Sequence, residues 1–250
     1  STWVGLIEAV SLQKPTVVLM EIPGPVLTPW RNKVAAAACL FTGGERTGKA
    51  WASILFGDAA PAGKLPVALP ATEADALRPH AGDVYYNEGL LTSYRSSVLK
   101  AAYPFGHGLT YSHFAIGRPA RYHHGCYARL CLHVNVTNTG SRAGKQVVQA
   151  YVRFRHSVVE PRMVLRGFQK TRNLAPGEKE QVGLLFGDRD LSVYEELVHG
   201  WMVQDNYQVL IGLSSEDIRE TFDPSGSGSV TLRLHVGVGL LLAFLIQAWS

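Results

Sequence analysis

The chain has 250 residues, of which 46% are apolar and 18% charged, and its formal net charge is +4. This length allows one large core or two smaller ones. Lys and Arg are scattered singly, without a basic run or basic residues interleaved with aromatic ones, which argues against a nucleic-acid-binding protein. Because no initiator Met precedes Ser1, we expect the sequence to begin within a longer protein.

The N-terminal residues alternate between helical and strand-like patterns. Residues Trp3 to Ser11 have apolar side chains at helical spacing. Residues Thr16 to Met20 form an apolar run without polar alternation, which predicts a parallel strand buried on both faces. A second apolar run covers Val34 to Phe41, and a helical pattern covers Lys49 to Phe56. This order predicts an α/β layer.

A glycine-rich turn before the second helix approaches the pattern of a phosphate-binding loop. Gly43, four residues, Gly48 and Lys49 fit that spacing, but Ala50 stands where a Ser or Thr hydroxyl would hold Mg²⁺. Glycines also serve tight backbone geometry without any ligand. We therefore predict a structural turn, with no nucleotide and no cofactor.

The second half of the chain reads as an antiparallel β-sandwich. After Arg121, short stretches alternate with period two, with turn signals about every ten residues. We predict an α/β domain at 1–118, an all-β sandwich at 119–222 and a Gly/Ser linker with an apolar tail at 223–250. Alternation predicts ten sandwich core residues: Val134, Val136, Val148, Tyr151, Leu165, Phe168, Val182, Leu184, Val209 and Ile211.

Several motifs, in order, resemble glycoside hydrolase family 3. The stretch GKAWASILFGDAAPAGKLPVALP resembles the family's helix followed by LFGD and P-x-G-x-L-P, and VYYNEGLLTSYR resembles its Y-x-E-G…G-Y-R segment. YPFGHGLTYSHF resembles its P-F-G-x-G-L-S-Y-x-x-F. The later strands, with VNVTNTGSRAGKQVVQAYV, resemble the fibronectin type III-like domain that follows in three-domain members. The likeness runs from about Leu6 to Arg219.

This resemblance implies part of a β-glucosidase-like enzyme that hydrolyses terminal β-glucosides or β-xylosides with retention, through two carboxyl groups. The family's nucleophile lies in an S-D-W type motif of a preceding barrel, and its acid/base in a G-E-G-x-D-R type segment. Neither motif occurs in this sequence. We therefore predict no catalytic residue here and an inactive isolated chain. The alternative is a non-catalytic module that binds carbohydrate or a protein.

A tyrosine-rich loop carries the candidate substrate residues. Glu88, Tyr94 and Arg95 are predicted to form the rim of a sugar pocket, because aromatic rings stack on sugars and charged groups bind hydroxyls. A structural ion pair between Glu88 and Arg95 is the competing interpretation. We expect Asp58 to cap a turn rather than to touch substrate.

The histidines and cysteines indicate no metal site. We interpret His123 and His124 as a solvated loop pair, since neither has ligands at metal-binding spacing. The three cysteines, Cys39, Cys126 and Cys131, do not form a disulfide framework, although a bridge between the last two stays open.

Two features bear on localisation. Asn135 begins an N-x-T glycosylation sequon, although that triplet also arises naturally in a strand and turn. The end of the chain has small residues at Ser225 to Ser227, a spacer and a terminal apolar block, which fits a GPI-attachment signal. An extra helix or a sequence artefact would produce the same pattern. These features favour an extracellular or cell-surface protein.

Overall fold

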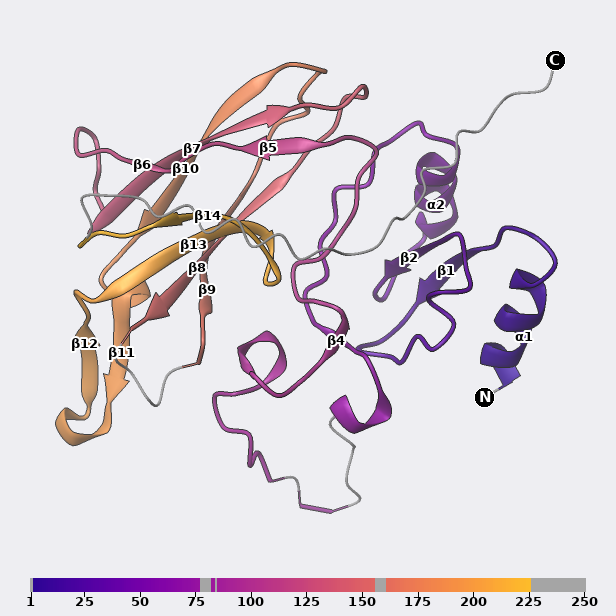
Figure 1. Cartoon of the computed structure of the whole chain (residues 1–250), viewed down its shortest axis with the longest axis horizontal. Helices are drawn as coiled ribbons and strands as arrows, with labels where there is room; N and C mark the ends of the chain where they lie inside the picture. Colours follow the sequence, from indigo (N-terminus) through magenta and orange to yellow (C-terminus); the bar gives the residue numbers. More distant parts are fainter. Residues whose placement is uncertain (1, 77–81, 84, 156–160, 226–250) are drawn as a thin grey trace.

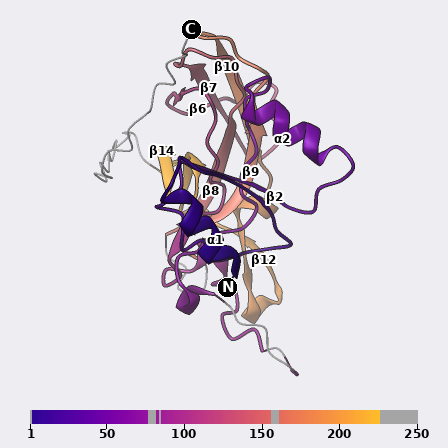
Figure 2. The ribbon, with the colours of Figure 1, turned by 90° about the vertical axis from the view of Figure 1, so that its right-hand side faces the viewer.

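The computed structural model describes residues 2–76, 82–83, 85–155 and 161–225. The apolar tail from Val236 to Ser250, with its predicted anchor, lies outside these residues. The described chain has an N-terminal part with both α-helices and a C-terminal part made of β-sheets (Figure 1). Seen from the side of the N-terminal part, α1 and α2 lie in front of the strands (Figure 2).

The N-terminal part follows the predicted order of helix, strand, strand, glycine turn and helix. It contains α1 (Thr2–Ser11), β1 (Val17–Glu21), β2 (Ala36–Leu40) and α2 (Thr47–Leu55). Strands β1 and β2 pair in parallel, as expected. The prediction that β1 is buried on both faces is wrong: Val17 and Leu19 are 48% and 38% exposed. The reason is that β1 and β2 form a sheet of only two strands, which leaves apolar positions uncovered among the described residues.

A long irregular segment connects the two parts. It includes β3 (Leu69–Pro70) and β4 (Ala101–Tyr103), which pair antiparallel, and two short 3-10 helices, η1 (Glu73–Asp75) and η2 (Ser93–Arg95). The backbone N–H and the hydroxyl of Thr72 both bond to the Asp75 carboxylate, which fixes the turn at η1.

The C-terminal part is the expected antiparallel sandwich. One sheet contains β5 (Phe114–Ile116), β6 (Ala120–Arg121), β7 (Leu130–Asn138) and β10 (Lys179–Phe186). The other has the order β14-β13-β8-β9, and a hairpin of β11 and β12 extends from the sandwich (Figure 1). The bounds of these six strands are β8 (Val147–Phe154), β9 (Val164–Lys170), β11 (Ser192–Glu195), β12 (Gly200–Val203), β13 (Tyr207–Ser214) and β14 (Asp217–Phe222).

The predicted domain division at residue 118 stays a prediction. Strand β5 lies just before it and pairs with β7 of the sandwich.

The sandwich core lies between the two sheets, and seven of the ten predicted residues lie in it: Val134, Val136, Val148, Val182, Leu184, Val209 and Ile211. The prediction for Tyr151 is wrong: its side chain is buried, but on the opposite face of β8, because its neighbours Ala150 and Val152 face the core. Leu165 is half-buried and packs on that same outer face. The prediction for Phe168 is wrong, since its side chain is 68% exposed. Strand β9 pairs Gly167 with Ala150 but Leu165 with Tyr151, so Arg166 is an extra residue and the alternation shifts. Gly167 faces the core near Phe186, and its neighbour Phe168 must point outward.

A disulfide joins Cys126 and Cys131, which settles the alternative that the sequence left open. It ties the turn after β6 to β7. Cys39, in β2, is a free thiol whose pKa is raised by burial. No helix in the described ranges has the length and apolarity needed to cross a membrane.

Candidate functional site

Tyr94, one of the predicted rim residues, anchors the irregular segment to the sandwich. Its hydroxyl accepts a hydrogen bond from the Leu165 backbone N–H at 3.0 Å. Its ring stacks on Phe105 with 4.3 Å between ring centroids and meets the edge of Tyr151 at 5.8 Å. These residues belong to a second apolar cluster on the outer face of the β14-β13-β8-β9 sheet, with Met163, Leu210 and Ile218. Both ends of the Tyr94 side chain therefore have partners within the chain.

The other two predicted rim residues lie on the same loop. The Arg95 guanidinium lies 5.9 Å from the centroid of the Tyr94 ring. Glu88 is half-buried, and its backbone oxygen accepts a hydrogen bond from the Leu91 N–H at 2.9 Å. In the described part of the chain, no ion pair joins Glu88 to Arg95. A role of Glu88, Tyr94 and Arg95 in substrate binding stays a prediction.

A buried glutamine completes the junction between the irregular segment and the sandwich. The Gln149 side-chain amide donates to the carbonyls of Gly106 at 3.0 Å and Leu213 at 2.7 Å, and its oxygen accepts from the Tyr151 hydroxyl at 2.6 Å. Burial raises the pKa of Tyr151, so the hydroxyl stays a donor. Gly106 has φ +78°, and a Cβ there would lie 2.0 Å from the Gln149 oxygen. Only glycine fits this approach.

Two basic residues at the same junction have lowered pKa values. The Lys64 ammonium donates to the Gly108 carbonyl at 2.5 Å. Burial lowers the pKa of Lys64 to about 8, while the negative charge of Asp217 acts in the opposite direction. Burial also lowers the pKa of His107, and the nearby Lys64 charge adds to this shift. His107 is therefore biased toward its neutral form.

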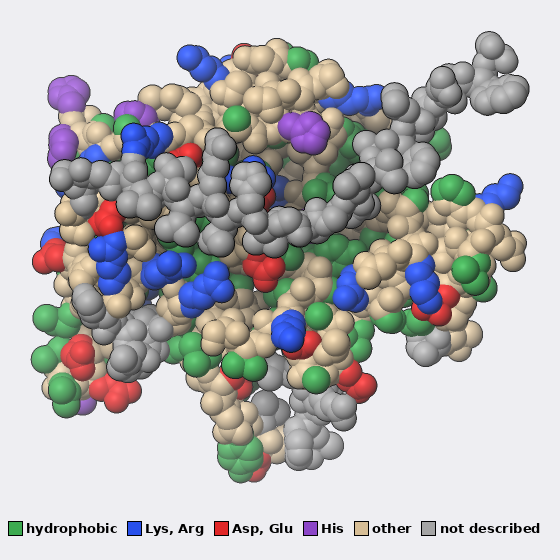
Figure 3. All heavy atoms as spheres, in the orientation of Figure 1, with side chains coloured by type: hydrophobic (Ala, Val, Ile, Leu, Met, Phe, Trp, Pro, Cys, Tyr) green, Lys and Arg blue, Asp and Glu red, His purple; other side chains and the backbone are tan. Residues whose placement is uncertain are grey.

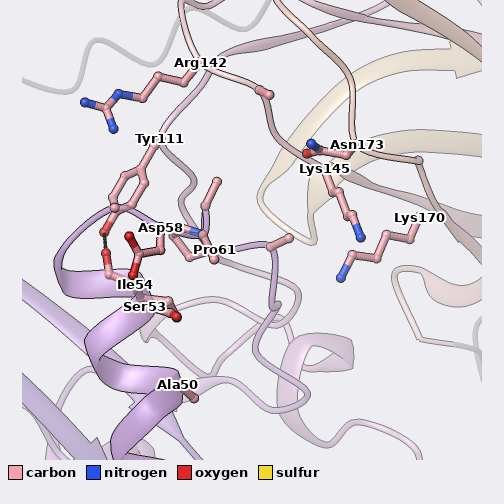
Figure 4. A pocket seen from close by; sticks show the side chains of 15 residues that line it. Ala50, Ser53, Ile54, Asp58, Pro61, Tyr111, Arg142, Lys145, Lys170 and Asn173 are labelled. Atoms are coloured by element: carbon pink, nitrogen blue, oxygen red, sulfur yellow. Dashed lines mark hydrogen bonds between the residues drawn. The ribbon is translucent and has the colours of Figure 1, made fainter.

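A cavity of about 800 Å³ lies between the N-terminal part and the sandwich (Figure 4). One wall comes from α2, the loop after it and Tyr111; the other comes from the connection before β8, the end of β9 and the connection after it. Tyr111 donates its hydroxyl hydrogen bond to the Ile54 carbonyl at 2.7 Å. Asp58 lines this cavity, and no hydrogen bond of its side chain to another described residue supports the expected turn cap.

Sequence reasoning missed the basic residues of this cavity, Arg142, Lys145 and Lys170. Lys145 and Lys170 are 25 positions apart and come together because Val147 pairs with Lys170 and Gly144 bridges to Leu174. These basic residues could have been predicted as neighbours only from the pairing of β8 with β9. That pairing cannot be predicted without the strand register and the position of the extra residue in β9.

The remaining candidates lie on the surface of the sandwich. His123 and His124 are exposed, and no cluster of three or more metal-ligating side chains occurs among the described residues. Asn135 is exposed on β7, while its backbone oxygen accepts a hydrogen bond from Gly117. Lys and Arg side chains are dispersed over the visible face rather than gathered in one patch (Figure 3).

Two domain families match the chain in the expected order. The glycosyl hydrolase family 3 C-terminal domain matches residues 4–111, and the fibronectin type III-like domain matches residues 146–215. The first match ends just before β5 and the second lies within the sandwich.

Curated relatives are named as β-glucosidases. The chain is 37% identical over 231 residues to a β-glucosidase of Rhizobium radiobacter, covering 86% of this chain and 28% of that protein. It is 35% identical to thermostable β-glucosidase B of Acetivibrio thermocellus, covering 85% of this chain and 30% of that protein. The chain thus spans about three tenths of the length of these relatives.

Solved structures show the same architecture. The β-glucosidase of Kluyveromyces marxianus in complex with glucose matches with a TM-score of 0.81 and 32% identity, over 89% of this chain and 28% of that one. DesR, a β-glucosidase from Streptomyces venezuelae in complex with D-glucose, matches with a TM-score of 0.80 and 32% identity, over 89% and 30%.

Proposed function

The chain belongs to glycoside hydrolase family 3, and from this premise we propose that it is part of a β-glucosidase-like enzyme that releases terminal β-linked sugars with retention. The observation that carries this proposal is the 37% identity over 231 residues to a protein named β-glucosidase. The order of the two domain matches supports it. Since the chain spans only about three tenths of the length of these relatives, we propose the activity and the substrate for the whole protein of which it is a part.

Within such an enzyme, this chain acts as a scaffold beside the active site. The proposal places both catalytic carboxyl groups in sequence other than these residues, because the S-D-W and G-E-G type motifs do not occur here. The loop with Glu88, Tyr94 and Arg95 is held on the sandwich by the Tyr94 hydroxyl and ring. A fixed loop is the arrangement that a sugar-binding rim requires.

The test uses an aryl β-glucoside and the chain from Ser1 to Ser250. We expect no hydrolysis above buffer, because the paired carboxyl groups supply most of the rate. A protein in which a barrel with the S-D-W type motif and a G-E-G type segment precede these residues is expected to hydrolyse the same substrate. Turnover by the chain alone would contradict the scaffold role, whether or not Glu88→Gln abolishes it.

We further propose a cell-surface location with a GPI anchor at the C-terminal tail. The support is the sequence pattern of small residues, spacer and apolar block. The protein is expected to leave the cell surface on treatment with phosphatidylinositol-specific phospholipase, and to be secreted when Val236 to Ser250 are deleted. Retention after phospholipase treatment would exclude the anchor.

A further inference from the structure

The cavity between α2 and the sandwich has one basic wall, which carries Lys145 and Lys170. Figure 4 shows the side chains of Lys145 and Lys170 entering it side by side. Both residues are exposed, and among the described residues neither forms a salt bridge. Arg142 stands at the same cavity, where a Cβ on Gly57 would lie 3.4 Å from one of its guanidinium nitrogens. Like charges held together repel, so this wall favours an anionic group.

The opposite wall is polar and aromatic rather than basic. It contains the Asp58 carboxylate and the Ser53 hydroxyl, with the Tyr111 ring beside them (Figure 4). The bond from the Tyr111 hydroxyl to the Ile54 carbonyl fixes the ring at the end of α2. A carboxylate accepts hydrogen bonds from hydroxyl groups, and a fixed ring offers an apolar face for a sugar.

We propose that this cavity binds an acidic saccharide, a short chain of uronic acid residues. The carboxylates of the ligand pair with Lys145 and Lys170, its hydroxyls donate to Asp58, and one sugar face lies against Tyr111. The volume of about 800 Å³ lies within the range of small-molecule sites.

Other classes of ligand would interact favourably with only one of the two walls of the cavity. A neutral saccharide leaves the two ammonium groups unpaired, and a bare anion is repelled by Asp58 and leaves Tyr111 unused. The site is formed by residues other than Glu88, Tyr94 and Arg95, and it does not depend on the hydrolytic activity proposed above.

The experiment measures binding of trigalacturonic acid to the full chain by titration calorimetry at low salt, with cellotriose as the neutral control. We expect saturable binding that Lys145→Gln/Lys170→Gln weakens at least about tenfold. The matched control, Lys14→Gln/Lys179→Gln, removes the same charge from exposed positions outside the cavity and is expected to weaken binding less than about twofold. Equal weakening by both pairs, equal binding of cellotriose, or no saturable binding would overturn the proposal.

Asp58→Asn separates a saccharide from a bare anion. It weakens binding if Asp58 accepts sugar hydroxyls, and it strengthens binding if Asp58 only repels a negative charge. Unchanged or strengthened binding overturns the saccharide assignment. Each variant is checked for a wild-type thermal transition, and Lys170→Gln alone replaces the double variant if that one does not fold.

Discussion

The sandwich and the N-terminal part use similar apolar residues in opposite ways. Strands β7, β8, β10 and β13 bury Leu, Val and Ile side chains between two facing sheets. In α1 and α2 no residue is buried, and Trp3 and Leu6 are among the exposed apolar side chains. An amphipathic pattern therefore identifies a helix or strand, but burial of its apolar face requires a second layer packed against it.

The irregular segment at the junction between the two parts is packed against the sandwich at a few positions. Tyr94 and Phe105 cover the outer face of the sheet at Tyr151, and Gln149 bonds to the Gly106 carbonyl. The irregular segment is thereby fixed by the sandwich rather than by β1 and β2. We expect the sandwich core to contribute most to the stability of this chain, the junction less, and the N-terminal part least. The following substitutions test this order.

The largest effect is expected in the core between the two sheets. Leu132→Ala removes a fully buried side chain and should lower the free energy of unfolding by about 2–5 kcal/mol. Phe168→Ala, at an exposed position of β9 two residues after the extra residue Arg166, should cost less than about 0.5 kcal/mol. Urea denaturation monitored by circular dichroism measures both. Similar losses in the two variants would contradict the described register of β9.

Much of the fold could be predicted because period-two alternation is a local property of each strand. It identified Val134, Val136, Val182 and Leu184 directly. It failed at Phe168, because the extra residue in β9 is set by pairing with β8 and not by the sequence around it. The prediction that β1 is buried on both faces failed for a different reason, because burial depends on the neighbouring layers rather than on the strand's own residues.

The candidate sites were less predictable because they combine distant segments. The motif around Glu88 and Tyr94 is contiguous and could be named, but the attachment of Tyr94 to Leu165 spans 71 positions. The cavity with Lys145 and Lys170 has no contiguous motif, so it is visible only after the domains are packed.

A smaller effect is expected from the pH response of Lys64 at the junction. Its folded-state pKa of about 8 lies below the usual 10.5, so between these values the unfolded chain binds a proton that the folded chain has lost. Stability should therefore rise with pH from 8 toward 10. Above that range the buried tyrosines act in the opposite sense, because burial raises the pKa of Tyr151 and Tyr207.

Thermal unfolding of the wild type and of Lys64→Met between pH 7 and pH 9.5 measures this response. The rise in stability should be absent from the variant, and it should be smaller than the effect of Leu132→Ala because solvent still reaches the ammonium. If stability rises with pH equally steeply in the wild type and in Lys64→Met, a titratable group other than Lys64 is responsible.

Tyr94→Phe should lower the free energy of unfolding by about 1–2 kcal/mol, since it leaves the Leu165 N–H without its partner. Tyr85→Phe, on the same loop but 74% exposed, is the matched control and should change nothing. Denaturant titration compares the two. Unchanged stability in Tyr94→Phe, together with a raised KM for an aryl β-glucoside in a longer, active protein, would make this hydroxyl a sugar contact instead of an anchor.

The smallest effect is expected in α1. Leu6 is 53% exposed, so Leu6→Ser should change the free energy of unfolding of this chain by less than about 0.5 kcal/mol, whereas Leu184→Ser, in the sandwich core, should cost several times more. A loss above about 1.5 kcal/mol for Leu6→Ser would show that α1 packs more tightly than described. The same substitution can be made in a longer protein of the family. If a further layer covers α1 there, Leu6 is buried and Leu6→Ser must cost more stability, because a leucine stabilises a fold by removing its apolar area from water.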